Sequence, residues 1–235
     1  MSINRSRLDR FISSSCNINR KKIRLYIAQK RIEVDGKIAT SVDQLVDNFS
    51  RISFDNQVLQ DNQTRYIMLH KPTGVVSATT DDKHKTVIDL LPYSYKSELH
   101  IVGRLDLNTS GLILLTNDSR WSELLTKPEN KVAKRYRVTL SNPLSNDYIE
   151  AFEQGMYFNY EDITTLPVKL EIISPYVADV ILYEGRYHQI KRMFGRFRNP
   201  VMALHRYSIG GLNLENNLNV GDSRLITPEE IATMT

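Results

Sequence analysis

Arg104 and Asp106 are two charged residues, separated by a single leucine, in a polar loop between apolar segments. The pair Ile101-Val102 leads into this loop, and the run 112–116 that follows has the composition of a buried strand. Such a loop presents its side chains at the rim of a sheet, a common place for working residues. A carboxylate there can act as nucleophile or base. Taken alone, such a pair is more often a turn cap with its ion-pair partner.

Residues 134–138 form a basic segment, Lys-Arg-Tyr-Arg-Val, with one aromatic side chain. The pattern fits a half-exposed strand in which Tyr136 either packs in the core or serves as a surface for stacking a nucleic-acid base. Residues 69–74 read as a strand that runs into a Pro/Gly turn. By itself, the segment 69–74, which contains Lys71, predicts an ordinary loop.

Residues 184–194 combine basic side chains with a helical pattern. In a helix that starts near His188, Ile190 and Phe194 are four residues apart and face the core, which leaves Lys191 free to point elsewhere. A plain amphipathic basic helix would have the same pattern.

The spacing of apolar residues predicts two domains of different character. Up to about residue 40, it predicts a helix carrying Leu8, a second helix capped by Asn19, and a hairpin that turns at Asp35-Gly36. Residues 47–64 are polar and read as the end of this module plus a linker. Later strands are expected at 66–69, 75–78, 112–116, 136–140, 168–173, 177–182 and 201–204, and helices at 87–91, 121–125, 148–152 and 189–197. This order predicts an α+β fold: a small α/β module, then a domain with a mostly antiparallel mixed sheet flanked by helices.

Positive charge is unevenly distributed along the 235 residues, whose net charge is +4. Residues 1–37 hold ten Lys/Arg against three acids, and residues 184–206 hold six against one, so the rest of the chain is acidic. Two basic regions suit a polyphosphate partner, although two solvated basic faces would look the same. The single cysteine, Cys16, excludes a disulfide framework, and the five dispersed histidines lack metal-ligand spacing. With no long apolar run, we expect a soluble, cytoplasmic protein that needs no metal and no membrane.

The segment Gly103–Asp118 resembles the signature of the pseudouridine synthases related to the RsuA and RluA types, G-R-L-D-x-x-T-x-G-L-x-L-L-T-N-D, at every specified position. The segment around Lys191 resembles that of the RsuA-type branch of this family. The resemblance implies that Asp106 is the catalytic residue and that Arg104 contacts RNA and fills the space left by a flipped base. It also implies that Tyr136 stacks on the target base, that Lys191 lies beside Asp106, and that Leu204 packs against the site.

The N-terminal residues resemble the RNA-binding domain named after ribosomal protein S-four, which grips RNA through shape and phosphates. We therefore expect an RNA-binding domain plus linker over residues 1–58 and a catalytic domain over 59–235. The side chains expected to bind RNA are Arg7, Arg20, Lys21, Arg24, Lys71, Arg104, Arg186 and Arg192.

The resemblance implies isomerisation of a uridine to pseudouridine during bacterial ribosome biogenesis, without any cofactor. We expect the protein to be a monomer, although the sequence does not determine the oligomeric state. The form G-R-Y-H-Q-x-K-R-M-F around Lys191 favours small-subunit (16S) ribosomal RNA as the partner. Two alternatives stay open: the same chemistry on large-subunit RNA or transfer RNA, and a non-catalytic RNA-binding protein of ribosome assembly.

Overall fold

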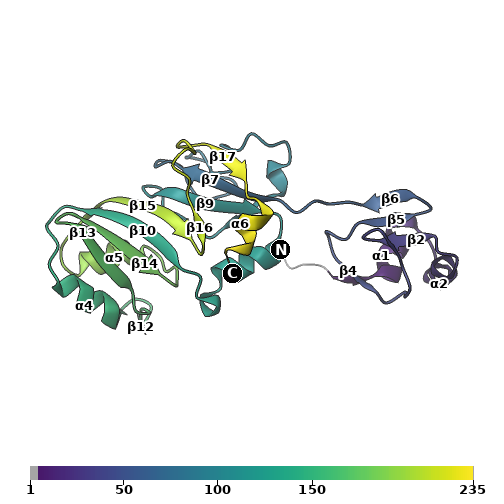
Figure 1. Ribbon diagram of the computed structural model, residues 1–235, viewed down its shortest axis with the longest axis horizontal. Coiled ribbons are helices and arrows are strands. Elements are labelled where there is room, and N and C mark those ends of the chain that lie inside the picture. Colours follow the sequence, from purple (N-terminus) through teal and green to yellow (C-terminus); the bar gives the residue numbers. More distant parts are fainter. Residues whose placement is uncertain (1–4, 235) are drawn as a thin grey trace. The chain divides into compact units, whose positions relative to one another are not determined.

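The computed structural model describes residues 5–234 and divides the chain into two units, Met1–Thr64 and Arg65–Thr235 (Figure 1). Each unit has its own hydrophobic core, and each is described here by itself. None of the helices between residues 5 and 234 is long and apolar enough to cross a membrane.

The N-terminal unit packs two helices, α1 (Leu8–Cys16) and α2 (Arg20–Ala28), against small sheets. The Asn19 side chain accepts a hydrogen bond from the Lys21 N–H, so it caps α2 as the sequence predicts. A four-stranded sheet has the order β3-β2-β5-β6, and β1 pairs with β4. The strands are β1 (Ser6–Arg7), β2 (Ile32–Val34), β3 (Lys37–Ile38), β4 (Leu45–Val46), β5 (Ile52–Phe54) and β6 (Gln57–Gln60).

Two hairpins build this sheet. Asp35 and Gly36, with φ of 52° and 72°, form the two-residue turn expected from the sequence. Asp55 and Asn56, with φ of 51° and 63°, form a second turn of the same kind between β5 and β6. The polar segment read as a linker thus contains a hairpin that completes the sheet, and the expected division after residue 58 falls inside β6.

The second unit contains a nine-stranded mixed sheet with the path β13-β14-β10-β15-β9-β7-β17, to which β16 adds on β15 and β8 on β9. Every pairing is antiparallel except that of β9 with β15. The predicted α+β class with a mostly antiparallel mixed sheet is therefore confirmed. The strands of this nine-stranded sheet are β7 (Tyr66–Lys71), β8 (His100–Val102), β9 (Ser110–Thr116), β10 (Lys134–Leu140), β13 (Lys169–Ser174), β14 (Val177–Leu182), β15 (Val201–Ile209), β16 (Leu212–Asn213) and β17 (Ser223–Leu225).

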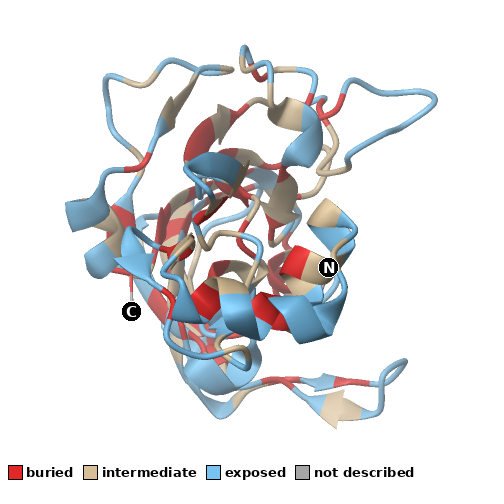
Figure 2. Ribbon diagram, turned by 90° about the vertical axis from the view of Figure 1, so that its right-hand side faces the viewer, coloured by how far each residue is buried: buried red, intermediate tan, exposed pale blue. Residues whose placement is uncertain are grey.

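Helices cover both faces of this sheet. Helices α4 (Asp147–Gln154) and α5 (Gln189–Gly195) contribute to one core, whereas α3 (Ser119–Thr126) contributes to the other; α6 (Pro228–Ala232) packs at its edge. Central strand β9 sends Ile113 and Leu115 into the first core and Leu112 and Leu114 into the second. This explains its continuous apolar run, because a strand buried on both faces has no polar side to alternate with. Buried residues accordingly gather on the inner strands, and the loops are mostly exposed (Figure 2).

Two predicted elements are wrong. The expected strand at 75–78 is only an isolated bridge between Val76 and Thr86, and the expected helix at 87–91 is a series of turns. Val75 and Val87 are nevertheless buried in the core. The apolar residues of both segments thus pack in the core without the predicted elements, because segments this short take their backbone conformation from their surroundings.

Candidate active site

Asp106 lies in the loop that joins β8 to β9, and this loop is held by backbone hydrogen bonds. The Leu105 N–H donates to Ser77 Oγ at 3.0 Å, and the same hydroxyl donates to the Leu105 carbonyl at 2.7 Å. The Gly74 N–H donates to the Leu107 carbonyl at 2.9 Å. The Pro/Gly turn after β7 and the segment that follows it therefore support the residues on both sides of Asp106.

Lys71, at the end of β7, is completely buried beneath the same loop. Its ammonium donates to the carbonyls of Pro72 at 2.9 Å, Asp106 at 3.2 Å and Thr109 at 2.8 Å. Burial lowers the pKa of Lys71 to about 8, an effect that the nearby Asp106 carboxylate opposes. The expectation that Lys71 binds RNA is therefore wrong: all its hydrogen bonds go to the backbone, and it holds the loop.

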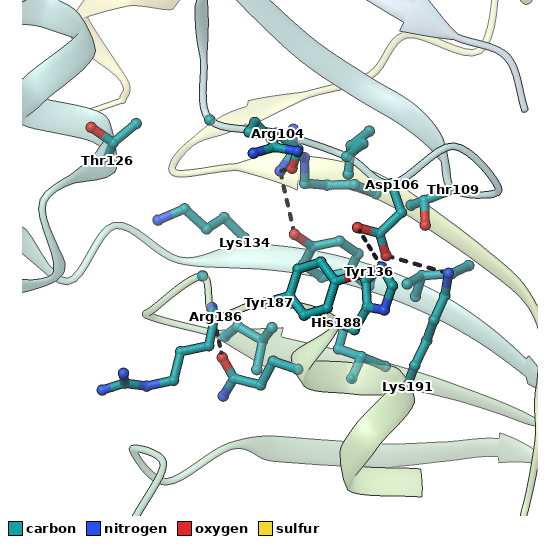
Figure 3. A pocket seen from close by; sticks show the side chains of 18 of the residues that line it. Arg104, Asp106, Thr109, Thr126, Lys134, Tyr136, Arg186, Tyr187, His188 and Lys191 are labelled. Atoms are coloured by element: carbon teal, nitrogen blue, oxygen red, sulfur yellow. Dashed lines mark hydrogen bonds and ion pairs between the residues drawn. The ribbon is translucent and has the colours of Figure 1, made fainter. Parts of the chain in front are cut away.

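The Asp106 carboxylate, about one-third exposed, has a different partner on each oxygen (Figure 3). Lys191 Nζ lies 3.3 Å from Oδ2, so the juxtaposition expected from the sequence is present. His188 Nε2 lies 3.4 Å from Oδ1. Both partners come from the start of α5, where Ile190 and Phe194 anchor the helix in the core as their spacing indicated.

Tyr136 on β10 is buried, but its ring still lines the cavity next to Asp106. Its hydroxyl accepts a hydrogen bond of 3.3 Å from Nη1 of Arg206, a buried guanidinium on β15. Arg206 also donates through Nε to the Leu112 carbonyl at 2.8 Å. The tyrosine is therefore both a core residue and a wall of the site, and its ring position is set by Arg206.

The cavity has a volume of about 410 Å³ and opens beside Asp106. Arg104, exposed at its rim, and Leu204, buried in its wall, both line it as expected. Lys134 and Arg186 lie on the side away from Lys191 (Figure 3). Burial, together with the positive charge of Arg206, lowers the pKa of Lys134 to about 8.

The residues expected to bind RNA have different surroundings. Arg186 reaches the cavity and pairs with the buried Glu184 at 2.8 Å. Arg192 instead forms a two-pronged contact with Glu161, at 2.6 and 2.7 Å, and lies over the Phe158 ring, so it does not line the cavity.

In the N-terminal unit, Arg7 and Arg20 both contact Asp9, at 3.3 and 2.9 Å. Arg20 and Arg7 lower the pKa of that carboxyl against the opposing effect of burial. Lys21 and Arg24 are exposed on α2. Unlike Arg7 and Arg20, these two side chains do not contact Asp9.

Sequence reasoning missed three of the basic residues that line the cavity: Lys134, His188 and Arg206. Each lies in a segment for which the sequence predicts a function, but the prediction assigned that function to a neighbouring residue. Within residues 5–234, no group of three or more His, Cys, Asp or Glu side chains is placed to hold a metal ion.

Residues 65–195 match the family described as RNA pseudouridylate synthase, which is more than half of the chain. The protein belongs to this family, and it is an RNA pseudouridine synthase; the resemblance found in the sequence is confirmed.

Its relatives share almost its full length. It is 45% identical to ribosomal small subunit pseudouridine synthase A of Pseudomonas aeruginosa, over 97% of this chain and 100% of the relative. It is 39% identical to the protein of the same name from Escherichia coli K12, over 97% and 99%. A crystal structure of a pseudouridylate synthase superposes with a TM-score of 0.71 at 36% identity and covers 97% of this chain and 99% of its own.

Proposed function

We propose that the protein converts a uridine of small-subunit (16S) ribosomal RNA to pseudouridine, with Asp106 as the catalytic carboxylate. One observation carries the proposal: the Asp106 carboxylate opens onto a cavity of about 410 Å³ that the Tyr136 ring also lines. A cavity of this size suits a single base that has left its helix and lies on an aromatic ring.

The reaction breaks the bond from ribose C1′ to uracil N1, turns the base, and joins C1′ to C5. The C5 proton is lost and N1 gains a proton, so there is no net oxidation or hydrolysis. The ionised Asp106 serves as nucleophile or base, and Lys191 at 3.3 Å stabilises its charge. Tyr136 and Leu204 form walls that hold the detached base while it turns.

The choice of 16S RNA rests on the relatives' names, on their near-complete overlap with this chain, and on lysine at position 191. We propose that the protein acts as a monomer in the cytoplasm. We further assign RNA binding to the N-terminal unit, where Lys21 and Arg24 on α2 are exposed, and catalysis to the second unit.

The test uses transcripts of 16S RNA, 23S RNA and transfer RNA, incubated with the wild-type protein and with Asp106→Asn, followed by pseudouridine mapping. We expect one new pseudouridine in 16S RNA with the wild type and none with the variant, since an amide is neither nucleophile nor base. Asp82→Asn makes the same chemical change at an exposed loop position outside the cavity and should stay active.

Two results would contradict the proposal. If Asp106→Asn kept more than a few per cent of the wild-type rate, Asp106 would not be the catalytic group. Modification confined to 23S RNA or transfer RNA would retain the chemistry but assign a different substrate.

A further inference from the structure

His188 has an unusual backbone conformation for its residue type. Its φ is 49°, in the left-handed region where a side chain with a Cβ is disfavoured. It immediately precedes α5, but its side chain makes no capping hydrogen bond to that helix. Strained residues of this kind persist only where the surrounding structure supports them, and they concentrate at functional sites.

The support comes from Glu184, a buried carboxylate. It accepts hydrogen bonds from the Leu166 N–H at 2.9 Å, from Arg186 Nε at 2.8 Å and from Gln189 Nε2 at 2.9 Å. The Gln189 side chain in turn accepts a hydrogen bond from the Arg186 N–H at 3.2 Å. Arg186 and Gln189, which flank residues 187–188, are thus both hydrogen-bonded to Glu184. These hydrogen bonds hold His188 in its left-handed conformation.

This conformation directs the imidazole towards Asp106 and not towards the helix. Its Nε2 lies 3.4 Å from Asp106 Oδ1, while Lys191 Nζ lies 3.3 Å from Oδ2. The ring of Tyr187, which is 72% exposed, stacks on the imidazole at 3.9 Å with an angle of 17° between the planes (Figure 3). The imidazole is therefore restrained by its backbone, by the ring above it and by the carboxylate.

We propose that His188 is a positioning residue for Asp106, held in place by Tyr187. Since an ionised carboxylate only accepts, the Nε2 facing it carries a hydrogen. With one partner on each oxygen, the plane of the carboxylate is set, and each oxygen keeps a second lone pair for the substrate. The inference rests on the assignment of Asp106 as the catalytic carboxylate.

The first test is His188→Gly, measured by single-turnover pseudouridine formation, RNA affinity and thermal unfolding. Glycine adopts the left-handed region without strain, so the melting temperature should stay the same or rise. RNA affinity should hardly change. The single-turnover rate should fall on the order of 10- to 100-fold, as expected when a reacting group loses its orientation.

Lys131→Gly is the matched control. Lys131 has the same φ of 49°, is exposed and does not line the cavity, so this variant relieves similar backbone strain without touching Asp106. Its rate should equal that of the wild type. Free imidazole added to His188→Gly should occupy the space beneath Tyr187 and recover part of the rate, but it should not affect Lys131→Gly.

A wild-type rate in His188→Gly would overturn the inference, and so would a fall in melting temperature with no rescue by imidazole, which would make the ring structural. Asp106→Asn separates the two proposals. If it is inactive while His188→Gly is fully active, only the positioning role fails; if Asp106→Asn is active, the proposed function fails as well.

Discussion

Two pairs of cations, one pair from each unit, differ in where their charge can act. In the N-terminal unit, Lys21 and Arg24 are exposed on the surface of α2. In the second unit, Lys71 is fully buried and Arg206 is 3% exposed. The buried pair bind backbone carbonyls and the Tyr136 hydroxyl, while the exposed pair are open to solvent.

A basic residue in an RNA enzyme is therefore not necessarily an RNA contact. An exposed cation attracts phosphate over several ångströms, and this attraction is weakened by salt. A buried cation instead organises the groups around it, since its desolvation must be offset by hydrogen bonds within the fold. Lys191 and Lys134, partly exposed at the cavity, stand between these extremes.

Among the variants of the cations, Lys191→Met is expected to have the largest effect, on the rate of catalysis. Because Nζ lies 3.3 Å from Asp106 Oδ2, losing the charge should lower the single-turnover rate on the order of 100-fold, a loss typical of removing one electrostatic partner of a reacting group. RNA affinity and its salt dependence should stay the same. Lys191→Arg should be partly active. A variant that loses affinity but not rate would place Lys191 among the RNA contacts.

Lys71→Met should chiefly affect the folded state. It leaves buried carbonyls in the Asp106 loop without their donor, which should destabilise the second unit by about 1–3 kcal/mol. The single tryptophan, Trp121 in α3, reports on the unfolding of this unit by its fluorescence. The salt dependence of RNA binding should not change. A shallower salt dependence with unchanged stability would show that Lys71 does contact phosphate.

The lowered pKa of Lys134 predicts that RNA binding depends on pH. Its pKa of about 8 means that it is mostly charged at pH 7 and mostly neutral at pH 9. If its ammonium contacts RNA, affinity should fall as the pH rises through 8, with the loss of about one phosphate contact. Lys134→Arg stays charged and should bind equally at both pH values. An identical pH dependence in the wild type and Lys134→Arg would exclude this contact.

The smallest effect is expected for the double variant Lys21→Gln/Arg24→Gln. Removing two phosphate contacts should reduce the slope of log affinity against log salt by roughly 1.4 to 1.8. Stability and the single-turnover rate on bound RNA should not change, since both side chains are exposed on α2. An unchanged slope would show that this face of α2 does not touch RNA.

Local patterns predicted much of the fold. The Asn19 cap, the Asp35-Gly36 turn and the run at 112–116 each depend on neighbouring residues, and each appears in the structure. The β5–β6 hairpin was missed because Asp55-Asn56 lies in a polar segment, where the alternation of Ile52–Phe54 was too short to stand out.

The amino-acid sequence was enough to predict the fold class from helical and strand periodicity, and to predict the family from a long motif. The nearness of Lys191 to Asp106 was implied by the resemblance to that family. Which cations are exposed and which are buried became clear only from the tertiary structure. Lys71 and Lys21 are the same residue type, and nothing in their local sequence indicates that one is buried against four backbone carbonyls while the other is exposed. That outcome depends on segments far apart in the chain, as does the contact of His188 with Asp106, which joins residues 82 positions apart.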